Sequence, residues 1–155
     1  MIESIQSVFS TISTAAATLK TFRELLKGKK GDTRIFLEEL KENAGLCWLV
    51  MEMDTDPMKM VDELRTEEYD RLLKTNFDFN SLKKQRISGD ERIEKSDLAS
   101  FLGKETASLV ENIYDRIKEL KRIYRVDKDN PKVRWRVRII NLQKRILLLL
   151  WHLKK

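Results

Sequence analysis

Apolar residues recur every three or four positions along most of this chain, the spacing that one face of an α-helix produces. The first such series predicts a helix over residues 2–27, which the segment Gly28-Lys29-Lys30-Gly31 ends. A second helix is predicted from an N-cap at Asp32 to about Met53. Its later part, residues 46–51, is apolar on every side, so we expect protein to enclose it.

The middle of the chain is less regular. The sequence Asp54-Thr55-Asp56-Pro57 predicts a turn, with the aspartate before the proline as the cap of a third helix. This third helical region extends to about Thr75, but its apolar spacing slips near Thr66, so two short helices are an alternative to one. Residues 76–103 predict a partly irregular crossover that contains a short helix capped by Ser96.

Two further helices are predicted, over residues 104–126 and from Pro131 nearly to Lys155, with Asn130 as the cap of the second. The last helix has two apolar faces on nearly opposite sides. One face holds Val133, Val137, Ile140, Leu147 and Trp151, and the other holds Trp135, Ile139, Leu142, Ile146, Leu149 and Leu153. Such a helix is either central in its own domain or shared with a second copy in a homo-oligomer. We favour the first alternative because the crossover carries enough apolar side chains to cover the second face.

These elements predict an all-α fold, an antiparallel bundle of four long helices plus the crossover, in one domain over residues 1–155. Only 5 Gly and 2 Pro occur in 155 residues, which fits poorly with an all-β domain. Two topologies are open. With simple up-and-down alternation, the 126–131 turn lies near Asp54. If the crossover runs back along the bundle, that turn joins Lys27, and the apolar segments 46–51 and 146–151 meet. We favour the second topology for that reason.

Positive charge is concentrated in the second half of the chain. Residues 1–75 hold 11 Lys or Arg against 14 Asp or Glu, whereas residues 76–155 hold 20 against 11. The segment 118–138 alone has a net charge of +6, equal to that of the whole chain. A local excess of this kind indicates a binding patch for an anionic partner. Its candidate residues are Lys118, Lys121, Arg122, Arg125, Lys128, Lys132, Arg134, Arg136 and Arg138.

The start of the last helix makes this patch unusual. Arg134, Arg136 and Arg138 lie where the helix dipole disfavours positive charge by roughly 0.3–1 kcal/mol each. A bound anion would offset that cost, and the alternative is a solvated basic face that aids solubility. The patch predicts a non-enzymatic interaction module that binds an acidic protein surface or a nucleic-acid backbone. For nucleic acid, only Tyr124 and Trp135 are interleaved with the charge as stacking groups.

The sequence excludes several kinds of chemistry. The single Cys47 excludes an internal disulfide, and with one histidine a Cys/His zinc site is excluded as well. Neither a phosphate-binding glycine loop nor a Glu-x-x-His motif for a di-metal site occurs. We therefore expect no cofactor and no metal. The start, Met1-Ile2-Glu3-Ser4, lacks the basic region of a secretory signal, which predicts a cytoplasmic protein.

One pair of residues suggests an enzyme instead. Arg145 and His152 are separated by six residues, and this spacing resembles the loose R-x4-6-H motif of HEPN-type ribonucleases, which are all-α bundles. The resemblance implies that the two side chains act on an RNA phosphodiester, usually across a dimer. The chain departs from the motif because residues 146–151 are all apolar and no polar residue follows the arginine. The other interpretation is that His152 is a polar residue near the end of the chain without a catalytic role.

The first predicted helix, 2–27, allows another function. Its apolar face is backed by serines and threonines rather than by charge, which resembles in architecture the membrane-active bundles of some cell-death and immunity effectors. The first nineteen positions contain no basic residue, however, and this argues against attachment to anionic lipid. The other interpretation is a helix that its neighbours cover.

Overall fold

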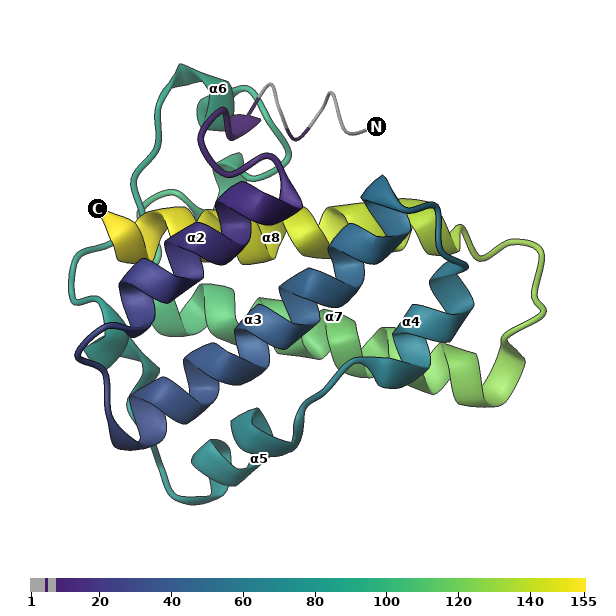
Figure 1. Cartoon of the computed structure of the whole chain (residues 1–155), viewed down its shortest axis with the longest axis horizontal. Coiled ribbons are helices and arrows are strands. Elements are labelled where there is room, and N and C mark those ends of the chain that lie inside the picture. The colour runs from purple at the N-terminus through teal and green to yellow at the C-terminus, as the bar shows by residue number, and fades with distance from the viewer. Residues whose placement is uncertain (1–4, 6–7) are drawn as a thin grey trace.

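The computed structural model describes residue 5 and residues 8–155, and over this part of the chain it is all-helical and has no strand. Its helices cross one another in a packed arrangement, with α2 and α3 lying across α7 and α8 (Figure 1). In chain order the elements are α2 (Ala15–Leu26), α3 (Gly31–Glu52), α4 (Pro57–Glu63), α5 (Glu67–Lys74), η1 (Phe79–Leu82), α6 (Glu91–Glu94), η2 (Ala99–Phe101), α7 (Thr106–Asp127) and α8 (Trp135–Lys154).

The first predicted helix is shorter than the sequence indicated. Helix α2 has 12 residues and begins after Thr14, whose hydroxyl accepts a hydrogen bond from the Ala17 N–H at 3.1 Å. The Thr18 hydroxyl donates to the Ile12 carbonyl at 3.0 Å, so threonines hold the preceding segment in a non-helical form. Phe9 and Ile12 are buried there nonetheless, as their apolar spacing requires. Residues 1–4, 6 and 7, on which part of this prediction falls, lie outside the described residues.

Helix α3 agrees closely with the second predicted helix, but its start and its apolar segment differ in detail. The N-cap residue is Lys30 rather than Asp32, and no side chain caps the helix. Within the apolar segment 46–51, most side chains are buried, but Leu49 remains 41% exposed. Enclosure of this segment is therefore incomplete on one side.

The third helical region is divided into α4 and α5, as the slip near Thr66 suggested. Asp56 caps α4 by accepting the Met58 N–H at 3.1 Å, and Pro57 is the first helical residue, both as predicted. The crossover contains only short turns of helix. The short helix predicted after Ser96 is η2, whose N-cap residue is Leu98, and the Ser96 hydroxyl accepts the Leu98 N–H at 3.1 Å. The further turn α6, which was not predicted, is capped by Asp90.

Helix α8 is central, which confirms the first of the two alternatives for its apolar faces. It contacts α2, α3, α4 and α7, and its buried residues include members of both faces, such as Ile140 and Ile146. The two faces therefore give no reason to place a second copy on this helix. Its start was predicted four residues too early, because Asn130 accepts the Lys132 N–H within a turn and the helix begins only at Trp135.

Three contacts along α8 establish the topology. The Gln143 side chain donates to the Ala44 carbonyl at 3.0 Å, and Arg136 donates to the Val50 carbonyl at 2.8 Å, so α8 runs antiparallel to α3. His152, near the end of α8, meets Thr106 at the start of α7, so these two helices are antiparallel as well. The turn between α7 and α8 consequently lies near the end of α3, as simple up-and-down alternation requires.

The favoured topology, in which the crossover runs back along the bundle, is wrong. The crossover begins and ends at the same place: Asn80, at its start, accepts the N–H of Ala107 at 2.8 Å, and the Lys83 carbonyl accepts the Thr106 hydroxyl. Residues 76–103 therefore form an excursion that returns to its origin. Because Gln143 lies beside Ala44 and Arg136 beside Val50, the apolar segments 46–51 and 146–151 do not meet as that topology required.

Candidate binding site: the basic corner

The nine cationic residues predicted from the sequence lie on the second half of α7, on the following turn and at the start of α8. We call this set, with the members named in the sequence analysis, the basic corner. In Figure 1 the loop that joins α7 to α8 lies at the right of the molecule. The start of α8, with Arg136, lies at the acidic end of α3 rather than near Lys27.

Two members of the basic corner are held by α4, α5 and the segment between them. Lys118 forms an ion pair with Asp70 on α5. Lys121 donates hydrogen bonds to the backbone carbonyls of Asp62, at 2.9 Å, and Leu64, at 2.6 Å. These two ammonium groups stabilise the packing of α7 against α4 and α5, and their charge is partly satisfied within the chain.

Two more members are paired at the start of α8. Arg136 contacts the Asp54 carboxylate at 3.2 Å in addition to the Val50 carbonyl, and Arg138 lies 3.6 Å from the carboxylate of Glu119. These carboxylates offset the unfavourable interaction of the two arginines with the helix dipole. For Arg136 and Arg138, the predicted need for an external anion is therefore met by the chain itself.

The other five members have no carboxylate partner among the described residues, and all five are exposed. We call them the open cations: Arg122, Arg125, Lys128, Lys132 and Arg134. The first two lie near the C-terminal end of α7, where the helix dipole favours positive charge. Arg134 is the N-cap of α8, where the helix dipole disfavours positive charge, and it has no carboxylate partner among the described residues.

A groove of about 280 Å³ lies beside the open cations, between α5 and α7. Its lining contains one carboxylate and four cationic side chains, so it has a net positive charge. The lining residues are Thr66, Asp70, Lys118, Lys121, Arg122 and Arg125. An extended acidic segment could lie along this groove and reach Arg122 and Arg125.

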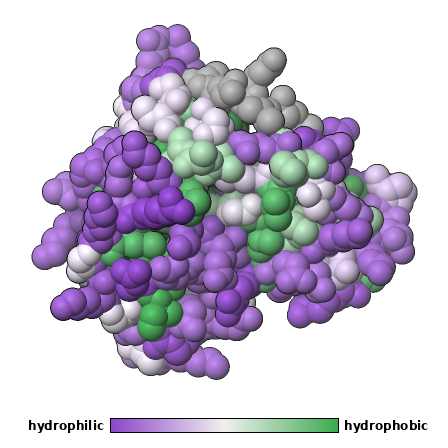
Figure 2. Space-filling view, in the orientation of Figure 1, coloured by the Kyte–Doolittle hydropathy of each residue, from purple (hydrophilic) through white to green (hydrophobic). Residues whose placement is uncertain are grey.

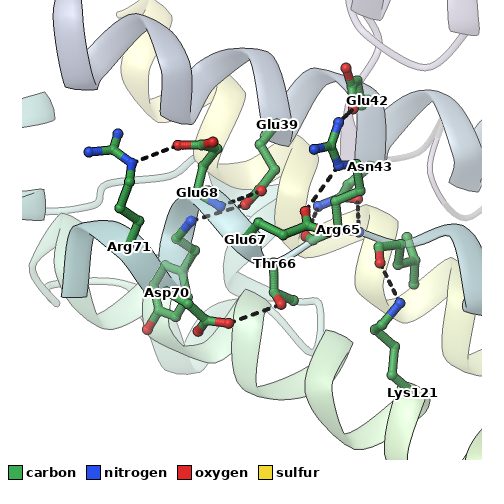
Figure 3. A network of polar contacts seen from close by, with 12 residues as sticks. Glu39, Glu42, Asn43, Arg65, Thr66, Glu67, Glu68, Asp70, Arg71 and Lys121 are labelled. Atoms are coloured by element: carbon green, nitrogen blue, oxygen red, sulfur yellow. Dashed lines mark hydrogen bonds and ion pairs between the residues drawn. The ribbon is translucent and has the colours of Figure 1, made fainter. Parts of the chain in front are cut away.

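The α5 wall of this groove is positioned by Asn43, a buried residue on α3. Its side-chain amide donates to the Arg65 carbonyl at 2.9 Å and accepts the Arg65 N–H at 2.8 Å (Figure 3). Both backbone groups of the residue between α4 and α5 are thereby satisfied without a helix. The break at this point is thus fixed by a specific pair of hydrogen bonds.

Glu39, one turn before Asn43 on α3, fixes the start of α5. Its carboxylate accepts the N–H groups of Glu68 at 2.8 Å and Tyr69 at 3.2 Å, which are unpaired at a helix N-terminus (Figure 3). Burial raises the pKa of Glu39, although these two N–H groups partly oppose the shift. Neither residue was predicted from the sequence, yet each is a polar position on the buried face of α3, flanked by Leu40 and Ala44.

The two aromatic residues of the corner are not free to stack on nucleobases. Trp135 is half-buried, and its ring N–H donates to the Lys128 carbonyl at 3.3 Å. Tyr124 is also half-buried, and the Lys128 ammonium lies 5.7 Å from its ring centroid. The corner therefore presents charge without an open aromatic surface.

Arg145 and His152, the pair that resembles the ribonuclease motif, are both buried. His152 is 1% exposed, and its Nε2 lies 2.9 Å from the Thr106 hydroxyl oxygen. That hydroxyl donates its only proton to the Lys83 carbonyl at 2.7 Å, so it must accept from a protonated Nε2. Burial, followed by the positive charges of Lys83 and Lys155, lowers the pKa of His152 to about 4.

Outside the corner, an apolar groove of about 290 Å³ lies between α2 and α3. Trp48 and Leu49 contribute to its lining, and the same face of the molecule shows hydrophobic patches among mainly hydrophilic residues (Figure 2). The acidic residue at its edge, Glu52, already accepts the Ala15 N–H at 2.9 Å. The groove thus lacks a feature that would select a particular ligand.

No helix in the described residues has both the length and the apolar character needed to cross a membrane. Phe9 and Ile12, which belong to the apolar face of the N-terminal segment, are buried in the core. Across residues 5 and 8–155, no group of three or more His, Cys, Asp or Glu side chains is placed to hold a metal ion.

The chain matches no known protein family, and no significant similarity is found to curated proteins or to solved structures. Its function must be inferred from the geometry described above.

Proposed function

We propose that this chain is a non-enzymatic, cytoplasmic helical-bundle module that uses the basic corner to bind an acidic partner. The observation that carries the proposal is that the five open cations have no carboxylate partner among the described residues, although many other cations in the chain do. Unpaired cations at one corner create a positive potential that attracts an anionic surface and speeds association with it.

The partner we favour is an acidic protein segment rather than a nucleic acid. Asp127 and Asp129 are exposed among the open cations, and these acidic groups would repel a continuous line of phosphates. The packed positions of Tyr124 and Trp135 also remove the stacking contacts that single-stranded nucleic acids use. A protein segment can place its carboxylates selectively and avoid the two aspartates.

The test is a fluorescence anisotropy titration with an oligo-glutamate peptide and with oligo-dT. The double variant Arg122→Glu/Arg125→Glu reverses two open cations beside the groove, and we expect it to weaken peptide binding roughly 10-fold, since exposed charge pairs contribute up to about 1 kcal/mol each. A matched control is Lys20→Glu/Arg23→Glu on α2, where both residues are exposed and Arg23 likewise lies in the last turn of a helix. The control has the same net charge but should retain peptide binding.

The two probes separate the possible partners. Stronger binding of oligo-dT than of the peptide, with an affinity that falls steeply between about 50 and 200 mM salt, would show that a nucleic-acid backbone is the partner instead. An equal loss of peptide affinity in the two double variants would show that binding depends on net charge only. That result would refute a specific role for the basic corner.

A further inference from the structure

A second group of cations lies away from the basic corner, where α7, α8 and the crossover meet. It consists of Arg116 on α7, with Lys144 and Arg145 on α8, and among the described residues the carboxylate that pairs with them belongs to Asp97 in the crossover. Lys144 lies 2.6 Å from Asp97, and Arg145 lies 3.8 Å from the other oxygen of the same carboxylate. Two cations therefore share one anion.

Arg145 is the least satisfied member of this group. It is only 6% exposed, and its sole hydrogen bond among the described residues is from Nη1 to the Asn141 carbonyl at 2.8 Å. Its Nε–H is buried and has no acceptor. A buried guanidinium normally has its donors paired, because an unpaired buried charge costs several kcal/mol.

Arg116 adds to the excess of positive charge in this group. Its Nε–H donates to the Asn112 side chain at 3.1 Å, and it forms no ion pair with a described residue. Burial lowers the pKa of Arg145, and the positive charge of Arg116 lowers it further, against the opposing effect of Asp97. Three cations and one carboxylate leave a local net charge of +2 in a partly buried place.

The exposure of Asp97 shows how a ligand could reach these cations. The side chain of Asp97 is 46% exposed, whereas that of Lys144 is only 12% exposed, so the carboxylate lies on the solvent side of the cations. Asp97 is in a turn of the crossover and not in a helix, so it can move without disturbing α7 or α8. Lys144 and Arg145 outweigh the effect of burial and hold the pKa of Asp97 below its usual value, so the carboxylate is charged at neutral pH.

We propose that Arg116, Lys144 and Arg145 form a binding site for a phosphate dianion, free or at the end of a small phosphomonoester, and that Asp97 occupies this site in the unliganded chain. A dianion matches the net charge of the cluster, and guanidinium groups bind phosphate oxygens with two parallel hydrogen bonds. The Asp97 carboxylate is the internal competitor that the ligand displaces. This site is independent of the basic corner and of its proposed acidic partner.

The test measures binding of inorganic phosphate and of glycerol 3-phosphate by calorimetry, at constant ionic strength maintained with chloride. Arg116→Gln removes a cluster cation that has no carboxylate partner, and we expect it to weaken binding on the order of tenfold. The matched control is Arg122→Gln, on the same helix but in the basic corner, and it should bind as the wild type does. Asp97→Asn removes the competitor, so it should bind phosphate about tenfold more tightly even if the unliganded variant is less stable.

A second measurement does not depend on variants. Phosphate should shift the NMR signal of the Arg145 Nε–H group in the wild-type chain, because that donor gains an acceptor. Binding of either probe with this pattern supports the proposal. It is overturned if phosphate binds neither the wild type nor Asp97→Asn, or if Arg122→Gln weakens binding as much as Arg116→Gln does, which would place phosphate at the basic corner.

Discussion

The buried His152 should make the stability of this protein depend on pH. The pKa of its imidazole is about 4 in the folded chain, against 6.5 for an unperturbed histidine. The folded state therefore disfavours the proton, and the stability that His152 contributes is fully present above pH 6.5 and is lost as the pH falls from 6.5 towards 4. Once His152 is protonated in both the folded and the unfolded state, this loss of stability reaches about 3 kcal/mol, since one pKa unit corresponds to roughly 1.4 kcal/mol.

The matched variant is His152→Gln. The Gln Nε2 can still donate to the Thr106 hydroxyl, so the hydrogen bond is kept while the titrating group is removed. Between about pH 7 and pH 4.5, the free energy of unfolding of the wild type should fall by roughly 2 kcal/mol more than that of the variant. Carboxylates that also titrate in this range affect both proteins equally, so the difference isolates His152.

The assay is urea unfolding followed by circular dichroism at several pH values, combined with an NMR titration. His152 is the only histidine in the chain, so its imidazole signals need no assignment by mutagenesis. The same spectra should show the tautomer with the proton on Nε2. A wild type and a variant with parallel stability profiles, or a measured pKa near 6.5, would refute the burial of this side chain and the hydrogen bond that explains it.

Three further predictions concern stability, and urea unfolding measures all of them. Asn43→Ala should lower the free energy of unfolding by about 1–3 kcal/mol, because it leaves both backbone groups of Arg65 without partners, and hydrogen exchange should show the loss at the α4–α5 junction. Gly45→Ala should raise stability by roughly 0.5–1 kcal/mol, because a Cβ there meets no atom within 4 Å and Gly is unfavourable inside a helix. Gly89→Ala should lower it by about 1–3 kcal/mol, because the new Cβ would lie 2.9 Å from the Ile93 Cβ.

The parts of the fold that the sequence predicts well are those that depend on neighbouring residues. The apolar period locates α3 and α7 almost to the residue, and the slip near Thr66 indicates the division between α4 and α5. The central position of α8 is also predictable, because two apolar faces on one helix need cover on both sides.

The errors arise where polar side chains compete with the helix. Residues 9–14 keep a helical apolar spacing, but the hydroxyls of Thr14 and Thr18 bond to nearby backbone groups and favour another conformation. Asn130 behaves in the same way before α8, where it stabilises a turn instead of starting the helix. The apolar periodicity alone does not reveal where side chains bond to nearby backbone groups in place of the helix.

The gathering of the basic corner was predictable, but the pairing of its members was not. The nine cations are close in sequence, so any fold would bring them near one another. Their carboxylate partners come from distant segments: Asp70 lies on α5, and Asp54 follows α3. Since the topology decides which acidic segment meets the corner, the wrong topology could not indicate which of its cations are paired.

The same pairing links ligand binding at the corner to the stability of α5. One wall of the groove is α5, which depends on the backbone hydrogen bonds that Glu39 and Asn43 accept and on the ion pair between Asp70 and Lys118. A partner that occupies the groove binds only the state in which α5 is in place, so it must stabilise α5 against local opening. Conversely, loss of the Asn43 hydrogen bonds lowers the population of that state and weakens binding, although every cation of the corner is unchanged. The affinity of the basic corner therefore depends partly on the buried side-chain amide of Asn43 on α3. A count of surface charges would not reveal this dependence.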